Sequence, residues 1–344
     1  MNNNDWNNVF PEVPQNFHET VQRTLNTYVL NKSRRKKVMK KRFPIVLAAV
    51  IATLCVTAAA AYVMQWNDKL TERFGANEQQ QSKLTSAGAV ASVEQTVTEN
   101  GLTVTAVQTL GDKNGVYLLF DIKAPKGIAL SDTNLFEGTS AEIEGIGNGV
   151  NCSGGFMSDT DNSGSPSGAV NERYYEIWLD NSEQKDWNGK KITLGFTNLQ
   201  ADKGKLDMYT VVEGEWDLSW TLSYMDQTQT FEINDTYDIN GQEVLVKSIE
   251  LSPLSMTFDI GGDGLKQLID DSDFNQCGCL CTLSLTMQDG AIFDPKGPGS
   301  EAGMDNSYTR TTRFDKVLDV DQVTDFTLTF PWEKTSNTLT VPLP

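Results

Sequence analysis

The chain holds 344 residues, with 28 Lys and Arg against 46 Asp and Glu, which gives a formal net charge of −18. This length leaves room for two domains, each large enough to bury its own core. The charge is unevenly distributed, since residues 1–42 carry a net charge of +6 and residues 65–344 a net charge of −24. So acidic a C-terminal part excludes nucleic acid as its partner, because phosphates require a basic surface.

The cytoplasmic tail that we expect at residues 1–42 contains apolar residues at spacings of four, four and three: Phe17, Val21, Leu25 and Tyr28. This spacing predicts an amphipathic helix with one apolar stripe. Because so short a segment cannot bury a core and a short helix is marginal in water, the stripe needs a membrane surface or another protein. We expect it to bind a cytoplasmic partner. The alternative is a loosely ordered stub with an accidental periodicity.

Residues 43–64 form an uncharged apolar run, which as a helix would extend about 33 Å, the thickness of one hydrocarbon core. Eight Lys and Arg lie directly before it, in residues 32–42. The positive-inside rule therefore predicts a single membrane-spanning helix in the lipid bilayer, with residues 65–344 outside the cell. The alternative is a cleaved signal peptide with a small-residue site at residues 58–61, but the long leader and the long run favour an anchor.

Residues 65–89 contain few large apolar residues, scattered charges and a run of three Gln at positions 79–81. We expect a stalk here, with one or two helical turns. Trp66 follows the apolar run closely, so we expect its ring in the aromatic belt at the outer membrane surface.

Beyond residue 89 the apolar period changes to two, which predicts strands with one buried face. The longest example alternates apolar with polar residues and consists of Trp216, Leu218, Trp220, Leu222 and Tyr224. Further strands are expected around Ile192, Leu194 and Phe196 and around Met256, Phe258 and Ile260. Turn dipeptides such as Asn100-Gly101 and Asn240-Gly241 bound the strands, as in β-hairpins.

The second half of this part repeats the first at a nearly constant shift, since Asn100-Gly101 corresponds to Asn240-Gly241. In the same way, Phe120-Asp121-Ile122 corresponds to Phe258-Asp259-Ile260. We interpret the repeat as the duplication of one β domain, with the copies at residues 90–225 and 226–344. About seven short strands in each copy favour two tandem immunoglobulin-like β-sandwich domains over a barrel or a propeller. The expected fold outside the membrane is therefore all-β.

Residues 65–344 contain no histidine, because the only one in the chain is His18. This excludes nucleophile systems and common zinc hydrolase sites that need imidazole as a base or a ligand. Spacing alone singles out no glycosidase pair among so many carboxylates. We therefore expect no enzyme activity, no catalytic residues, no metal site and no cofactor.

The cysteines have alternative interpretations. On a strand, Cys277, Cys279 and Cys281 would point three thiols to one face. They could then bind a metal, form a disulfide with Cys152 or a neighbour, or pack in the core as small apolar groups. The same phase continues in Leu283, Leu285 and Met287, which favours packing.

A second motif, at residues 159–164, matches the opening of a calcium-binding loop. Its twelfth position is Val170 instead of the Glu that binds the ion with two oxygens. A polar hairpin tip is therefore the favoured interpretation, and no metal is expected here.

Taken together, the chain resembles the membrane-anchored anti-sigma factors of Gram-positive bacteria, which join a short cytoplasmic helix, one membrane span and an ectodomain of unknown function. The resemblance is carried by residues 13–25, the basic run into the span, and residues 99–104, 116–120 and 246–254. It implies that the inner segment holds an extracytoplasmic-function sigma factor at the membrane until an outside signal, often through proteolysis, releases it. The tail lacks a His/Cys zinc motif, which excludes the zinc-binding type of anti-sigma domain.

The expected function is thus a membrane-anchored signalling regulator, whose tail sequesters a sigma factor and whose outer domains sense or bind an extracellular ligand. The alternative is a cell-surface adhesion or envelope-binding module whose tail only orients it. A sigma-factor gene immediately upstream would favour regulation, and its absence would favour adhesion.

Overall fold

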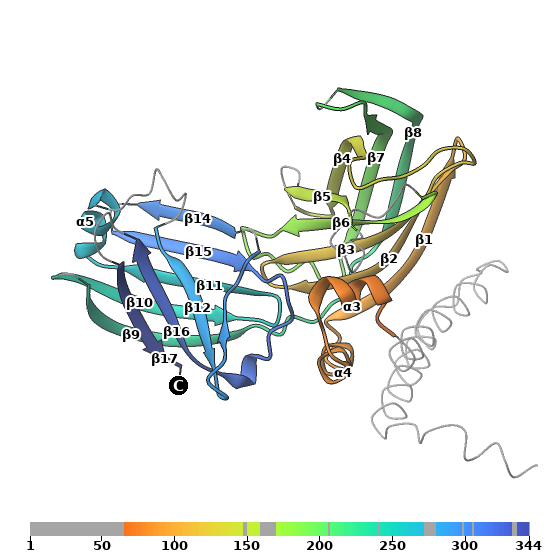
Figure 1. Ribbon diagram of the computed structural model, residues 1–344. Coiled ribbons are helices and arrows are strands. Elements are labelled where there is room, and N and C mark those ends of the chain that lie inside the picture. Colours follow the sequence, from red (N-terminus) through yellow and green to blue (C-terminus); the bar gives the residue numbers. More distant parts are fainter. Residues whose placement is uncertain are drawn as a thin grey trace, which may run out of the picture. The chain divides into compact units, whose positions relative to one another are not determined.

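The computed structural model describes residues 65–344, with gaps at 147–149, 159–169, 206, 240, 272–279, 298, 305, 332–335 and 344. This part of the chain is mostly β and forms several antiparallel sheets (Figure 1). None of its helices has both the length and the apolar character that crossing a bilayer requires. The predicted amphipathic helix and the predicted span at residues 43–64 lie outside the described residues.

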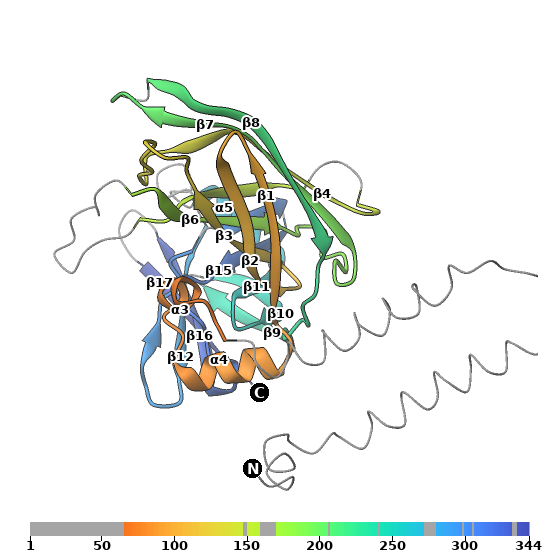
Figure 2. The same cartoon turned by 90° about the vertical axis from the view of Figure 1, so that its right-hand side faces the viewer.

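The first β region is built from two sheets, with the strand orders β1-β2-β3-β6-β5 and β4-β7-β8. Its strands are β1 (Val90–Glu99), β2 (Leu102–Asp112), β3 (Gly115–Lys123), β4 (Leu135–Ile143), β5 (Cys152–Phe156), β6 (Glu172–Asp180), β7 (Lys191–Asp202) and β8 (Met208–Thr221). The two sheets approach each other where β1 lies beside β8 (Figure 2). Nδ2 of Asn100 donates a hydrogen bond to the Glu213 carbonyl oxygen there, at 2.8 Å.

The core of this region confirms the predicted alternation in β7 and β8. Ile192, Phe196 and Trp216 are buried at 0 to 1% exposure, and the Phe120 ring contacts Phe196 edge-on with centroids 5.3 Å apart. By contrast, β3 does not alternate, because both of its faces are covered. Every second residue of β3 belongs to this core. Tyr117, on the opposite face of β3, belongs to a second buried apolar cluster, which also contains apolar side chains from residues 65–89.

The second β region also has two sheets, with the orders β9-β10-β11-β15-β14 and β13-β12-β16-β17. Its elements are β9 (Gln229–Ile239), β10 (Gln242–Leu251), β11 (Ser255–Gly261), α5 (Gly264–Asp271), β12 (Thr282–Met287), β13 (Ile292–Phe293), β14 (Gly299–Met304), β15 (Ser307–Arg313), the 3-10 helix η2 (Val320–Gln322), β16 (Val323–Pro331) and β17 (Ser336–Pro342). Val246, Phe258, Leu285 and Phe326 are among the residues that form its core.

The strand orders of the two regions correspond. The sheet order β1-β2-β3-β6-β5 matches β9-β10-β11-β15-β14, and β4-β7-β8 matches β12-β16-β17, with β13 added at the β12 edge. The strands that follow the two Asn-Gly dipeptides, β2 and β10, occupy the same place in their sheets. Gly101 and Gly241 both adopt a positive φ, 79° and 80°, which a glycine adopts without steric cost.

Residues 65–89 form two capped helices. The helix α3 (Asp68–Phe74) begins after Asn67, whose side chain accepts a hydrogen bond from the Lys69 N–H. The helix α4 (Glu78–Ser86) begins with a capping box between Asn77 and Gln80, in which each side chain satisfies a backbone N–H of the other residue. The caps stabilise helices that have little intrinsic stability at this length.

These helices correct the expectation of a stalk, because they pack against the β regions. Leu70, Phe74 and Leu84 are each at most 3% exposed. The few large apolar residues of the segment are thus all used for packing, whereas a free stalk would leave them in water. Trp66 is also buried, and its Nε1 donates a hydrogen bond to Oγ1 of Thr85 at 3.1 Å, so its ring packs inside the protein and not in the expected aromatic belt.

Candidate functional site

The two β regions are joined by a buried carboxylate. Asp112, at the end of β2, accepts hydrogen bonds at Oδ2 from the hydroxyls of Ser252 and Ser255. Its Oδ1 accepts from the backbone N–H groups of Asn114 and Gly115, at 2.8 and 3.1 Å. The turn between β2 and β3 therefore meets the turn between β10 and β11, which are equivalent hairpins of the two regions.

Burial dominates the electrostatics of this carboxylate. Removal from water raises the pKa of Asp112 above its ordinary value, while the hydrogen bonds from Ser252 and Ser255 partly oppose that shift. Neighbouring groups extend the contact, since Nδ2 of Asn114 donates to Oγ of Ser255 at 2.8 Å and Lys113 forms an ion pair with Glu250. Buried polar groups with complete partners specify one arrangement of the surfaces they join.

A second contact between the regions is made by Arg313, at the end of β15. Its guanidinium forms an ion pair with Asp180 of β6 and lies over the Trp178 ring, 5.0 Å from the centroid. Burial lowers the pKa of Arg313 from its ordinary value, although a guanidinium stays charged throughout the physiological range.

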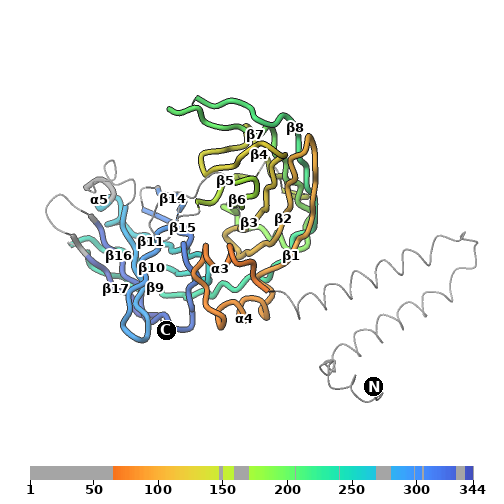
Figure 3. Tube along the Cα trace, turned by 45° about the vertical axis from the view of Figure 1, so that its right-hand side comes forward, coloured from red at the N-terminus to blue at the C-terminus, as the bar shows by residue number. Residues whose placement is uncertain are grey.

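The segment with α3 and α4 lies where the two regions meet. The Phe74, Tyr117 and Trp178 rings contact one another edge-on, with centroids 5.0 to 6.0 Å apart. On the other side, the Val317 N–H donates to the Phe74 carbonyl oxygen at 3.0 Å. Figure 3 shows α3 and α4 (orange) between the strands of the first region and the chain that leads to β16 (blue).

Residues 65–67 are held by a buried side chain. Gln108 of β2 is 4% exposed. Its Oε1 accepts from the Asn67 N–H at 2.7 Å, and its Nε2 donates to the Gln65 carbonyl oxygen at 2.8 Å. The side chain of Asn67 also donates to the Tyr174 hydroxyl at 3.2 Å. The first described residues are thus part of the packed structure.

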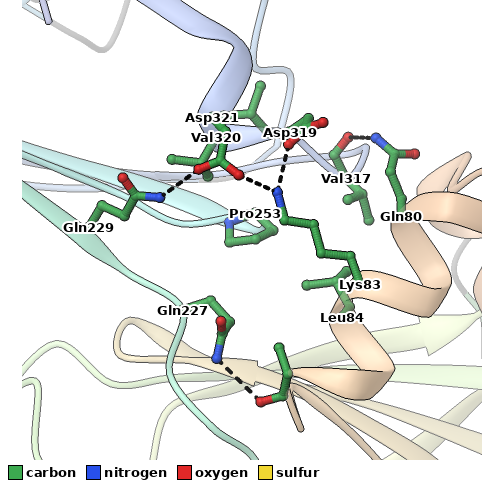
Figure 4. A pocket seen from close by; sticks show the side chains of 12 residues that line it. Gln80, Lys83, Leu84, Gln227, Gln229, Pro253, Val317, Asp319, Val320 and Asp321 are labelled. Atoms are coloured by element: carbon green, nitrogen blue, oxygen red, sulfur yellow. Dashed lines mark hydrogen bonds and ion pairs between the residues drawn. The ribbon is translucent and has the colours of Figure 1, made fainter.

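A cavity of about 230 Å³ lies between α4 and the second region (Figure 4). Across its rim, Nζ of Lys83 lies 2.9 Å from Oδ1 of Asp319 and 2.6 Å from Oδ2 of Asp321. Nε2 of Gln229 donates to Asp321 at 3.1 Å. The hydrogen bonds to Asp321 and Asp319 raise the pKa of Lys83, and the hydrogen bond from Lys83 lowers the pKa of Asp321. Leu84, Pro253 and Val317 are among the residues that form the apolar wall.

The partner-binding residues predicted from the sequence, Phe17, Val21, Leu25 and Tyr28, lie outside the described residues, as do residues 159–164 of the calcium-like motif. The contact between the hairpins was missed by sequence reasoning. A signal existed, since positions 112 and 252 have the same sequence separation as the two Asn-Gly dipeptides. Nothing in the repeat indicated that equivalent turns would touch each other.

Of the cysteines, Cys281 is buried in the core of the second region together with Leu285, so the predicted core packing is confirmed at this position. Cys277 and Cys279 lie outside the described residues. Cys152 is half-buried, with its thiol 3.7 Å from the Thr139 carbonyl oxygen, and burial raises its thiol pKa. Among the residues that the structure describes, no group of three or more His, Cys, Asp or Glu side chains is placed to hold a metal ion.

No protein-family model matches the chain, and no curated protein matches it. Among solved structures, it is similar to the conserved domain protein from Bacillus anthracis, with a TM-score of 0.51 and 14% sequence identity over 79% of this chain and 98% of that chain. At this identity the similarity shows the fold alone. Because each β region holds less than half of the chain, a match of this extent includes residues of both regions.

Proposed function

We propose that the chain is a membrane-anchored signalling regulator of the anti-sigma type. A cytoplasmic tail sequesters an extracytoplasmic-function sigma factor, residues 43–64 cross the bilayer once, and the β-rich part senses or binds a ligand outside the cell. The proposal is carried by the junction near residue 65. The basic segment ends at residue 42 and the uncharged apolar run at residue 64, and an acidic folded body begins directly after the run, with Gln65 and Asn67 hydrogen-bonded to Gln108.

This junction favours a regulator because the sequence has no linker between the predicted span, which ends at residue 64, and the folded body, which begins at Gln65. A tether with a long flexible linker would decouple the outer part from the membrane. Residues fixed to a buried side chain instead pass a displacement of the folded body to the adjoining chain. An adhesion module has no need of such coupling, since its tail only orients it.

The finer architecture belongs to the same proposal. Residues 90–225 and 226–344 are two immunoglobulin-like sandwich domains that arose from one duplicated domain. The matching strand orders and the nearly constant sequence shift between equivalent strands, such as β2 and β10, support this inference.

The experiment that tests the function compares partner capture by full-length chains in detergent. The double variant Phe17→Ala/Leu25→Ala truncates two residues of the apolar stripe. Loss of a buried anchor costs about 2 kcal/mol or more of binding free energy, which weakens affinity roughly thirtyfold. The variant should therefore release a sigma factor that the wild type captures, and transcription of the sigma-dependent genes should rise in the same strain.

The matched control is Glu19→Ala/Asn26→Ala, which changes two residues on the opposite face of the predicted helix. It should capture the sigma factor as the wild type does. If the wild type captures no sigma factor, or both double variants bind it equally well, the regulatory function is refuted in favour of the adhesion module.

A further inference from the structure

The segment of residues 66–89, with α3 and α4, contacts both β regions. To the first region, Nε of Arg73 forms an ion pair with Glu176 at 2.7 Å, and Asn67 is bonded to Gln108. To the second region, it is connected through the Phe74 carbonyl oxygen, through Lys83 and through Nε2 of Gln80, which donates to the Val317 carbonyl oxygen at 3.2 Å. One short segment thus bridges two folded cores.

The two sides of this bridge differ in strength. The side toward the first region is dry, with Leu70 and Phe74 fully buried and Phe74 packed against Tyr117 and Trp178. Toward the second region, Leu254 and Val317 belong to the same buried apolar cluster, but beside them the packing is interrupted by the cavity of Figure 4. The Lys83 side chain at its rim is 53% exposed. Exposed ion pairs and incompletely packed surfaces contribute little stability, so this side is the weaker of the two.

The end of α4 is also tied to the chain that connects the two regions. The Met225 N–H donates to the Gly88 carbonyl oxygen at 2.8 Å, and Nε2 of Gln227 donates to the Ala87 carbonyl oxygen at 3.3 Å. A movement of this connecting chain therefore displaces the end of α4 or breaks these hydrogen bonds.

We propose that α4 is a reversible clasp, which separates from the second β region at the Lys83–Asp319–Asp321 contact while both β cores stay folded. Only the consequence of opening the clasp depends on the proposed function. In a membrane-anchored regulator, its opening transmits a rearrangement of the outer part to residues 65–67, next to the predicted span. The opening itself is a property of the described residues and is measured without a sigma factor.

The test is hydrogen exchange on the full-length chain reconstituted in lipid nanodiscs, with peptides from α4 compared with peptides from β3 and β11. The variant Asp319→Asn/Asp321→Asn removes both ion pairs of Lys83. We expect amide exchange in α4 to accelerate about fivefold, which is the effect of losing exposed pairs of ordinary strength. Exchange in β3 and β11 should not change, because the cores stay closed. Added salt at about 0.5 M should reduce the difference from the wild type.

Charge-reversal variants distinguish local opening of α4 from a general folding defect. Lys83→Glu alone places like charges together and should open α4 further than the double Asn variant does. Combining Lys83→Glu with Asp319→Lys and Asp321→Lys restores the opposite charges and should return α4 exchange toward the wild-type rate. The matched control is Lys185→Met, which removes an exposed ion pair with Glu183 elsewhere and should leave α4 unchanged.

Two results would overturn the clasp. In the first, exchange in α4, β3 and β11 accelerates together in the double Asn variant, so that the segment opens only with the whole fold. In the second, α4 exchange is the same in the wild type, the double Asn variant and Lys83→Glu. Either result leaves the capture of a sigma factor by the tail untouched, so failure of the clasp and failure of the proposed function are distinguishable.

Discussion

At the scale of single residues, the buried carboxylate of Asp112 joins the two β regions. Four donors converge on its carboxylate, yet burial still raises its pKa. A group with a raised pKa in the folded state binds its proton more tightly there than in the unfolded chain. Its ionisation therefore costs stability as pH rises from the unfolded value, about 3.9, to the folded value. The carboxylate therefore stabilises the contact through its hydrogen bonds, while its charge opposes folding.

Substitutions of Asp112 distinguish the contribution of its hydrogen bonds to stability from the contribution of its charge. Asp112→Asn keeps an acceptor for the N–H groups of Asn114 and Gly115 and presents an amide to the hydroxyls, so stability at pH 7 should change by less than about 1 kcal/mol. Asp112→Ala leaves those N–H groups without a partner and should cost about 3 kcal/mol. Urea unfolding at a series of pH values from 7 down to about 4 measures both changes.

The sign of the pH effect provides the control. Wild type should gain stability relative to Asp112→Asn as the pH is lowered from 7 toward the unfolded pKa, about 3.9, because the folded wild type takes up a proton at Asp112 before the unfolded chain does. A loss from Asp112→Asn as large as that from Asp112→Ala would mean that the charge itself stabilises the contact.

At the scale of elements, the period-two pattern predicted strands that the structure confirms, as at Phe196 in β7 and Trp216 in β8. The period-two pattern did not hold for a strand that is covered on both of its faces. In β3, residues that face away from one core face the helices, so no polar side remains. The helices themselves were expected as part of a stalk, because three large apolar residues in α3 and α4 make too weak a pattern. Asn77 followed by Gln80 was the available signal, since it forms a capping box.

The edge strand β5 offers a matched pair of substitutions. A Cβ at Gly154 would lie 2.2 Å from the Glu176 carbonyl oxygen and 2.9 Å from Cγ1 of Ile177, whereas a Cβ at Gly155 would meet nothing within 4 Å. We expect Gly154→Ala to destabilise the protein by about 1 to 3 kcal/mol, because the strand must shift away from β6. Gly155→Ala should stay within about 0.5 kcal/mol of the wild type.

Thermal unfolding of the two variants measures the difference. Both positions lie in the same strand and both substitutions add one methyl group, so a general intolerance of β5 to alanine would lower both midpoints equally. An equal loss would contradict the close approach of Gly154 to β6.

At the scale of the whole molecule, charge predicted an acidic part and the period-two alternation predicted that this part is β-rich. The repeat predicted equivalent strands, which the structure places in equivalent sheet positions. The contacts around Asp112 and Lys83 were not predictable, because they depend on how two finished surfaces dock and not on any local period. The charge asymmetry remains the strongest feature of the chain. By the positive-inside rule it predicts an orientation in the membrane, and every proposed role of the tail depends on that orientation.

Orientation is tested with epitope tags at both ends of the full-length chain, in cells without a wall. Added protease should remove the C-terminal tag and leave the N-terminal tag intact, because a basic flank is retained on the cytoplasmic side. Protease added after lysis should remove both tags. Replacing Arg34, Arg35, Lys36 and Lys37 by Glu reduces the positive flank and should place part of the population in the opposite orientation. If the N-terminal tag of the wild type is cut in intact cells while the C-terminal tag is protected, the tail is outside and cannot hold a cytoplasmic sigma factor.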